Sequence, residues 1–257
     1  MNPYATTWPQ PGRQGTAGDD RLGHLLYTLG SPFVLIALAV AAHASGFDLM
    51  LSDRFFDVAG DRFPLRAEPL LELLGHRVAK SAVLAVWVGL LAAALATCRF
   101  EALRPWRAVL WATVGAMALG PTLVVVLKSF TAFPCPWSLQ RYGGLAPMAS
   151  TWFATPANAG NCFPAGHSAG GFSLFALVFA ARALGRPRLA WTLFWVALVT
   201  GVAFSGVRIV QGAHFASHAL WSAAIDWLAA GLVFLAIREC RYPSACAGSA
   251  PPGHGCP

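Results

Sequence analysis

Two histidines and an arginine lie close together near the carboxyl-terminal end of this sequence. Arg208, His214 and His218 stand where one apolar run ends and the next begins. Ionisable side chains at a membrane boundary are a functional site by default. Lys128 and His167 occupy the ends of two other apolar runs. We therefore predict that Lys128, His167, Arg208 and His214 meet in one site, with His218 beside them.

These side chains suit a tetrahedral phosphoryl group. The guanidinium of Arg208 offers a planar fork to phosphate oxygens, and Lys128 adds a point charge. Gly166 begins a predicted helix, whose free N–H groups favour an anion. One histidine can attack phosphorus while the other protonates the leaving oxygen, because the pKa of histidine lies near neutrality.

Each residue also has a simpler interpretation. Lys128 can snorkel from a helix end, Arg208 can be an interfacial anchor, and Gly166 can merely start a helix. A single histidine at the end of a span is usually structural. The joint occurrence of these residues favours the phosphate site.

A metal site is the competing interpretation of the two histidines. The spacing of His214 and His218 puts two ring nitrogens on one face of a helix. No glutamate follows His214, as it does in zinc proteases, and no other cluster of Cys, His and Asp has metal-ligand spacing. We expect neither a metal nor another cofactor.

The composition indicates a membrane protein. Of the 257 residues, 56% are hydrophobic and 11% are charged, whereas soluble domains carry about 25% charged residues. The net charge of +7 comes from short hydrophilic breaks between apolar runs, which is typical of membrane topology rather than of a nucleic-acid surface. The first twenty residues have no apolar core, so we expect no signal peptide.

Six apolar segments, each near the ~20 residues that a span requires, predict an all-α bundle of six transmembrane helices. They are Leu25–Ala44, Lys80–Thr97, Ala108–Leu127, His167–Leu184, Ala190–Phe204 and His214–Ile237. The fifth is short unless Ser205–Val210 continue its helix. The expected domains are a flexible tail at 1–24, a membrane domain at 25–237 and a Cys/Pro/Gly-rich tail at 238–257.

Basic residues predict the orientation of the bundle. The second-to-third and fourth-to-fifth connections and the carboxyl-terminal tail are rich in arginine, which places them and both termini in the cytoplasm. The predicted site then faces outward, toward the periplasm if the chain lies in a bacterial inner membrane. In the first outer connection, Leu65–Gly75 has apolar residues at helical spacing. This pattern fits a short interfacial helix or a solvated loop with one helical turn.

The candidate residues resemble the type 2 phosphatidic acid phosphatase (PAP2) superfamily of membrane lipid phosphatases. The motifs of that family are Lys-x6-Arg-Pro, Pro-Ser-Gly-His and Ser-Arg-x5-His-x3-Asp. The corresponding segments here are Lys128-x6-Cys135-Pro136, Pro164-Ala165-Gly166-His167 and Val207-Arg208-x5-His214-x3-His218. The resemblance covers Leu25–Ile237.

The resemblance implies a role for each matching residue. His214 would be the nucleophile that forms a phosphohistidine, and His167 would be the general acid. Lys128, Arg208 and the N–H group of Gly166 would hold the phosphoryl oxygens in the transition state. Ala165 stands where the family has serine. The resemblance implies no metal.

Two departures leave roles unfilled. Cys135 replaces a phosphate-binding arginine, and Arg141 in the same connection is a candidate substitute. His218 replaces the carboxylate that orients the nucleophile, for which an acid from residues 45–79 or a backbone carbonyl could serve. Asp226 is about 18 Å along the helix from His214, so we expect a structural pairing for it instead.

The six cysteines divide by side. Cys135 and Cys162 lie in the second outer connection, whereas the other four are predicted inside. A disulfide bond would form in an oxidising compartment and stabilise the loop by about 3.5 kcal/mol. Two buried thiols are the alternative.

The predicted activity is hydrolysis of a lipid phosphate or lipid pyrophosphate at the outer face of the membrane. Undecaprenyl pyrophosphate, lipid A phosphates, phosphatidylglycerophosphate and phosphatidate remain open as substrates. A lipid phosphotransferase of the same fold is an alternative. So is a catalytically silent lipid-binding protein, because two motif residues are replaced. The sequence does not indicate the oligomeric state.

Overall fold

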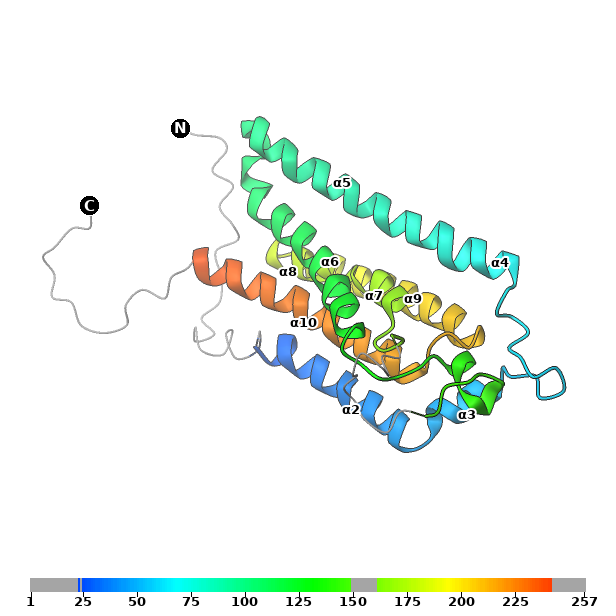
Figure 1. The fold of residues 1–257 in the computed structure, drawn as a ribbon. Coiled ribbons are helices and arrows are strands. Elements are labelled where there is room, and N and C mark those ends of the chain that lie inside the picture. Colours follow the sequence, from blue (N-terminus) through cyan, green and yellow to red (C-terminus); the bar gives the residue numbers. More distant parts are fainter. Residues whose placement is uncertain (1–22, 24, 149–160, 242–257) are drawn as a thin grey trace, which may run out of the picture.

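The computed structural model describes residues 23, 25–148 and 161–241, which form helices and contain no β-strand. Figure 1 shows them as a bundle. The longer helices are α2 (Ser31–Ala44), α5 (Ala79–Arg99), α6 (Arg107–Lys128), α9 (Pro187–Val210) and α10 (Ala216–Arg241). The shorter ones are η1 (Leu26–Gly30), α3 (Phe47–Asp53), α4 (Pro69–Leu71), η2 (Glu72–Val78), η3 (Glu101–Trp106), η4 (Pro136–Ser138), η5 (Gln140–Tyr142), α7 (Gly166–Phe172) and α8 (Phe175–Ala183).

Five helices of the described chain are long and apolar enough to cross a membrane. They are Leu26–Ala44, Ala79–Arg99, Glu101–Lys128, Pro187–Val210 and Ala216–Ile237. They match the predicted first, second, third, fifth and sixth spans, and α9 does include Ser205–Val210. The predicted count of six spans is not confirmed.

The predicted fourth span, His167–Leu184, consists of the two short helices α7 and α8. Ser173 follows α7, and its hydroxyl donates a 2.7 Å hydrogen bond to the carbonyl of Gly170. Such bonds from serine to the preceding turn bend helices. Both helices are largely buried by their neighbours, so neither is an independent span of full length.

Small residues let α7 and α9 approach closely. A Cβ atom on Gly171 would lie 2.8 Å from the Cα atom of Gly201. Nearby, the hydroxyl of Ser205 donates a 2.8 Å hydrogen bond to that of Ser168. Small residues at helix crossings allow the dense packing that holds helices together in membranes. This contact fixes α7, which carries His167 in its first turn, against α9, which carries Arg208 in its last turn.

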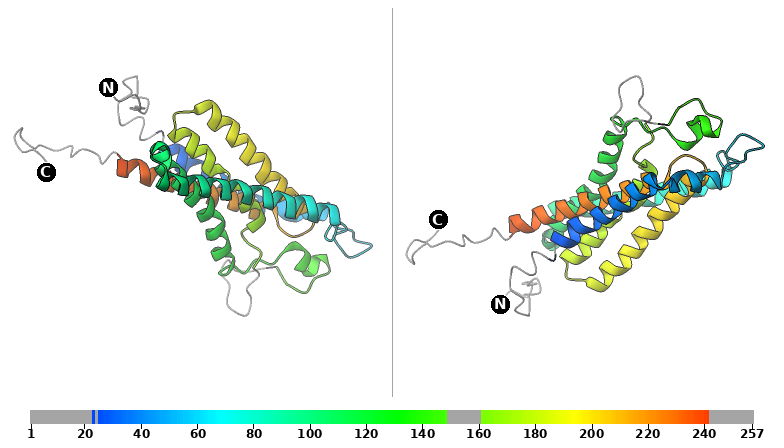
Figure 2. Two further views of the ribbon diagram at one scale, coloured as in Figure 1. Left: turned by 90° about the horizontal axis from the view of Figure 1, so that it is seen from above. Right: turned by 90° about the horizontal axis from the view of Figure 1, so that it is seen from below.

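Helix α10 is central and packs against α2, α6, α7 and α8. Trp227 lies in the core, with ring centroids 4.9 to 5.1 Å from those of Tyr27, Phe175 and Phe179. Its indole N–H donates a 3.2 Å hydrogen bond to the carbonyl of Tyr27. Helix α5 lies along one edge of the bundle and packs mainly on α6 (Figures 1 and 2).

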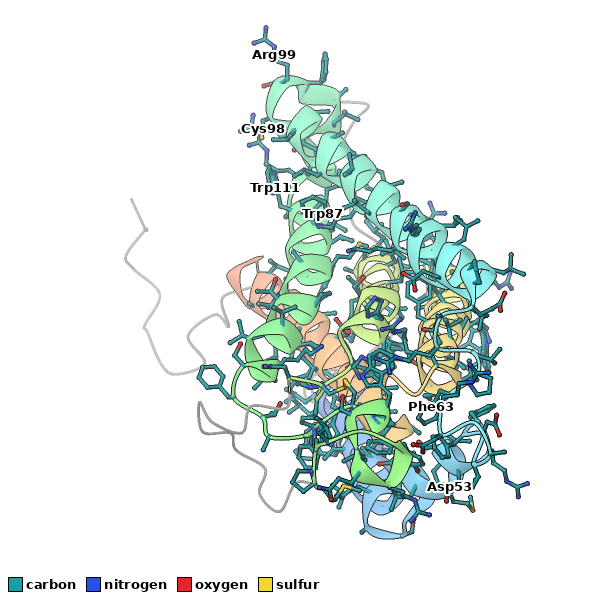
Figure 3. The ribbon with its side chains drawn as sticks, turned by 45° about the vertical axis from the view of Figure 1, so that its right-hand side comes forward. Asp53, Phe63, Trp87, Cys98, Arg99 and Trp111 are labelled. Atoms are coloured by element: carbon teal, nitrogen blue, oxygen red, sulfur yellow. A yellow bond between two sulfur atoms is a disulfide. The ribbon has the colours of Figure 1, made fainter. Side chains whose placement is uncertain are left out.

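The first outer connection differs from its prediction. The helical segment near Leu65–Gly75 is α4 and η2, which run directly into α5 instead of forming a separate interfacial helix. Helix α3 was not predicted from the sequence. Figure 3 shows Asp53 of α3 and Phe63 at the opposite end of the molecule from Cys98 and Arg99. The predicted tails, 1–24 and 238–257, lie outside the described residues, apart from residue 23 and the last turn of α10.

Candidate active site

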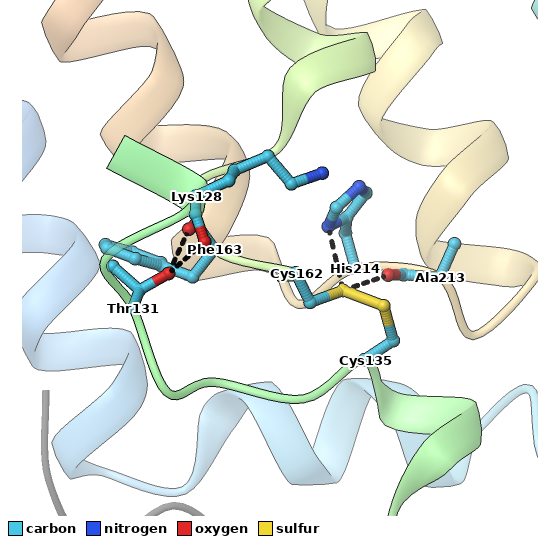
Figure 4. The surroundings of a disulfide bond; sticks show 7 residues. All are labelled: Lys128, Thr131, Cys135, Cys162, Phe163, Ala213 and His214. Carbon is cyan, nitrogen blue, oxygen red and sulfur yellow. Dashed lines mark hydrogen bonds between the residues drawn. A yellow bond between two sulfur atoms is a disulfide. The ribbon is translucent and has the colours of Figure 1, made fainter. Parts of the chain in front are cut away.

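A disulfide bond joins the two arms of the second outer connection. It links Cys135 to Cys162, whose Cα atoms are 5.2 Å apart (Figure 4). Beside it, the hydroxyl of Thr131 donates a 2.5 Å hydrogen bond to the carbonyl of Phe163. The segment that follows Lys128 is thereby tied to the segment that leads into α7.

His214 lies beside this disulfide. The turn between α9 and α10 places it there, because the N–H groups of Ala213 and His214 both donate to the carbonyl of Arg208, at 2.8 and 3.3 Å. Gly212 allows the turn with a positive φ of 69°. The His214 side chain is buried, and its Nδ1 atom is 3.5 Å from the Sγ atom of Cys162 (Figure 4).

Lys128 and Arg208 place positive charge near the His214 ring. Burial is the main reason that the pKa of His214 falls well below 6.5, and electrostatic repulsion from His218, Lys128, Arg208 and His167 lowers it further. The ring is therefore neutral near pH 7. The Lys128 amine points toward it (Figure 4) and lies 4.0 Å from the place of a Cβ on Gly166. The structure thus brings the predicted site residues around one imidazole.

Arg208 and Gln211 form the polar wall of the site. The Nη1 atom of Arg208 donates a 2.9 Å hydrogen bond to the Oε1 atom of Gln211. In the described part of the chain, neither Nε of Arg208 nor Nε2 of Gln211 has a hydrogen-bond partner, although both are buried. Buried donors without partners are costly and call for a ligand or water. Gln211 gave no sequence signal, because it occupies an unspecified position of the third family motif.

A sequence model of the PAP2 superfamily matches residues 109–242, slightly more than half of the chain. The chain belongs to the PAP2 superfamily. No curated protein matches it, and no solved structure does. PAP2 membership and the apolar helices together indicate a membrane protein of the phosphatase type.

Arg141, a predicted phosphate ligand, is paired with an acid of the first outer connection. Its Nε and Nη2 atoms donate to the carboxylate of Asp53, at 3.1 and 2.8 Å. The hydroxyl of Tyr142 donates to the same carboxylate at 2.8 Å. The hydrogen bond from Arg141 lowers the pKa of Asp53, while burial and Asp53 raise the pKa of Tyr142 to about 12. The guanidinium therefore links the two outer connections, and its role as a phosphate ligand stays a prediction.

Two positions that differ from the family motifs, His218 and Ala165, lie deep in the PAP2 domain. His218 is fully buried, and its Nδ1 atom has no hydrogen-bond partner among the described residues. Its ring stands edge-on to that of Phe163, with centroids 5.2 Å apart. Ala165 is also buried, and its N–H donates to the carbonyl of His218 at 3.3 Å. This bond holds the start of α7 against α10.

An acid from the first outer connection does reach α10, but not at His214. Asp48 is buried, and its two oxygens accept hydrogen bonds from the N–H and hydroxyl of Ser217, at 3.0 and 2.5 Å. Its Oδ2 atom is also 3.6 Å from Nδ1 of His43. Asp48 therefore caps α10, a role that the sequence did not reveal. The Nδ1 atom of His214 instead lies beside the sulfur of Cys162.

Asp226 lacks the expected partner. Its side chain is buried, and neither oxygen has a hydrogen-bond partner in the part of the protein that the structure describes. It packs against Gly120 of α6, where a Cβ atom would collide with it. Asp226 thus faces the bundle as expected, but the predicted pairing is not found.

Proposed function

We propose that this protein is an integral membrane phosphatase that acts on a lipid phosphate or lipid pyrophosphate through a phosphohistidine. The observation that carries the proposal is the position of the cations Lys128 and Arg208 beside the buried, neutral ring of His214, with His167 nearby. A neutral imidazole is a nucleophile, and the surrounding positive charge favours a phosphoryl dianion over other substrates.

The first step forms the phosphohistidine. Since Nδ1 of His214 faces Cys162, Nε2 is the atom that attacks phosphorus. The N–P bond forms as the bond to the leaving oxygen breaks, and His167 gives that oxygen a proton. Lys128 and Arg208 neutralise the equatorial oxygens. The unpartnered Nε of Arg208 and Nε2 of Gln211 supply donors that strengthen as charge builds up.

The second step returns the enzyme to its starting state. His167, now deprotonated, takes a proton from water as the water oxygen attacks phosphorus. The N–P bond breaks and inorganic phosphate leaves. A lipid acceptor in place of water would make the protein a phosphotransferase, so the product must be identified in the assay.

The position of the site fits a lipid headgroup. Lys128 is the last residue of α6, Arg208 is near the end of α9, and His214 precedes α10. These are the ends of candidate spans, where headgroups lie and acyl chains can stay in the bilayer. A disulfide beside the site fits an oxidising compartment, which supports a periplasmic orientation in a bacterial inner membrane.

Phosphate release from a panel of lipids tests this function. Detergent-solubilised protein is incubated with undecaprenyl pyrophosphate, lipid A, phosphatidylglycerophosphate and phosphatidate, alongside His214→Ala. We expect vanadate-sensitive release from at least one lipid, and none from the variant. Release unaffected by His214→Ala would overturn the mechanism. A folded wild-type protein that binds these lipids without releasing or transferring phosphate would instead be a silent lipid-binding protein.

A further inference from the structure

Cys162, His214 and His218 form a cluster whose combined chemistry the proposed mechanism does not use. The candidate ligand atoms of the three residues lie within 4.8 Å of one another, and all three side chains are buried. Cys162 approaches the histidines only in the folded chain, because it is more than fifty residues away in sequence. The spacing of the two histidines alone did not indicate a complete site.

The geometry of the cluster is close to that of a zinc site. Tetrahedral Zn²⁺ bound to a thiolate at about 2.3 Å and to an imidazole at about 2.0 Å separates sulfur from nitrogen by about 3.5 Å. The Sγ atom of Cys162 is 3.5 Å from Nδ1 of His214. The candidate ligand nitrogen of His218 lies within 4.8 Å of the ligand atoms of Cys162 and His214. The His218 ring has a buried Nδ1 atom without a partner among the described residues.

The disulfide bond keeps this cluster from binding a metal. A disulfide sulfur carries no negative charge, whereas zinc binds the thiolate. We propose that reduction of the bond between Cys135 and Cys162 converts Cys162, His214 and His218 into a Zn²⁺ site. If His214 is the nucleophile, as proposed above, the bound ion also blocks phosphate release.

The reductant would be a dithiol, acting by thiol–disulfide exchange. Its thiolate attacks Sγ of Cys135, which is only partly buried, whereas Cys162 is fully buried. Cys162 leaves as a thiolate. The second thiol of the reductant then attacks the mixed disulfide and releases Cys135, so the reductant becomes a disulfide and two electrons are transferred. Zn²⁺ binds the Cys162 thiolate and both neutral rings.

The surrounding charges define the fourth ligand. The positive charges of Lys128 and Arg208 near His214 repel a divalent cation. The negative charge of the Cys162 thiolate neutralises one of the two positive charges of Zn²⁺. The remaining charge and the two cations favour an anion, such as hydroxide or inorganic phosphate, in the fourth position.

A cysteine variant tests the site without any reductant. Cys135→Ala leaves Cys162 as a free thiol, and Cys135→Ala/Cys162→Ala removes it. Both full-length variants retain the other four cysteines, so metal bound elsewhere cancels in the comparison. After dialysis against Zn²⁺, elemental analysis should show about one more equivalent in the single variant, the stoichiometry of one three-residue site. With Co²⁺, the single variant should show charge-transfer absorption from the bond between the metal and the Cys162 thiolate. The double variant should lack this absorption.

The wild-type protein supplies the second measurement. The oxidised protein should match the double variant, and the same protein reduced with a phosphine should match Cys135→Ala. Equal metal content in all four samples would overturn the zinc site. This comparison decides the matter even if Cys135→Ala does not fold, because the reduced wild type retains every side chain.

Activity separates the zinc site from the proposed function. Zn²⁺ should inhibit the reduced wild type and leave the oxidised form active, with recovery after chelation. Zinc binding without inhibition would refute the regulatory part alone. Absence of phosphate release from every form would refute the proposed function and leave the zinc measurement standing.

Discussion

The Nδ1 atom of His214 lies 3.5 Å from the Sγ atom of Cys162, a sulfur that belongs to a disulfide bond. The PAP2 motif has a carboxylate at position 218 to orient this ring, whereas here that position is a buried histidine. The proposed nucleophile is therefore held by packing against the disulfide and by the turn that follows α9. This arrangement has consequences for pH dependence, substrate binding and stability.

The pH dependence of phosphohistidine formation should reflect the low pKa of His214. Only the neutral ring attacks phosphorus, and burial and positive neighbours lower its pKa well below 6.5. The rate of phosphohistidine formation should thus fall only as the pH drops well below 6.5. Rapid-quench measurement of the trapped phosphoenzyme gives this profile. An acidic limb at or above pH 6.5 would contradict the burial argument.

Removal of a neighbouring charge should move that limb. Lys128→Met takes away a positive charge that lowers the pKa of His214, so the acidic limb should shift to higher pH. The rate should also fall, because a phosphate-binding cation is lost. A lower rate with an unmoved limb would mean that Lys128 acts on the substrate without influencing the nucleophile.

Gln211 should act through Arg208. Its Oε1 atom accepts a hydrogen bond from the guanidinium, and hydrogen bonds to charged groups contribute about 1.5–3 kcal/mol. Gln211→Leu should therefore lower kcat/KM by about 10- to 100-fold. In Arg208→Ala, the same substitution should have little further effect. Additive losses would show that Gln211 acts independently of Arg208.

Arg141→Ala should leave phosphate release nearly unchanged. Its Nε and Nη2 atoms are engaged by Asp53, and exposed ion pairs contribute about 0–1 kcal/mol to stability. Lys128→Ala is the matched comparison, in which kcat/KM should fall by more than about 100-fold, as for removal of other transition-state contacts. A comparable loss in Arg141→Ala would restore it as the substitute for the motif arginine.

Asp48 should stabilise the protein by capping α10. Asp48→Ala removes the acceptor of two hydrogen bonds from Ser217, which should lower the free energy of unfolding by about 1–3 kcal/mol. Glu101→Ala is the control, because that side chain is 90% exposed. Denaturant titration in mixed micelles measures both. Equal stability of the two variants would exclude the capping role, and a double-mutant cycle with Ser217→Ala assigns the coupling.

The contact between α7 and α9 should tolerate no added methyl group. A Cβ atom on Gly201 would collide with the ring of Phe172, whereas one on Gly206 of the same helix meets nothing within 4 Å. Gly201→Ala should cost about 1–3 kcal/mol through overpacking, and Gly206→Ala should gain about 0.5–1 kcal/mol of helix propensity. Thermal unfolding in detergent compares them. A stable Gly201→Ala protein would mean that the two helices pack less tightly than described.

The helices, the membrane class and the four converging residues were readable from the sequence. Apolar runs of sufficient length must be helical, because lipid offers no partners to the backbone. Charged residues at the ends of those runs are then limited to the two ends of the bundle. That is why the sequence alone groups Lys128, His167, Arg208 and His214.

Contacts between distant segments required the folded chain. Asp48 lies outside the motifs, and Gln211 occupies an unspecified position of the third one. Their roles depend on Ser217 and Arg208 being within hydrogen-bond distance. The break between α7 and α8 was hidden, because hydropathy does not distinguish a span from two short helices buried by their neighbours. The sulfur of Cys162 and the ring of His214 are brought together by packing, which periodicity and composition do not encode.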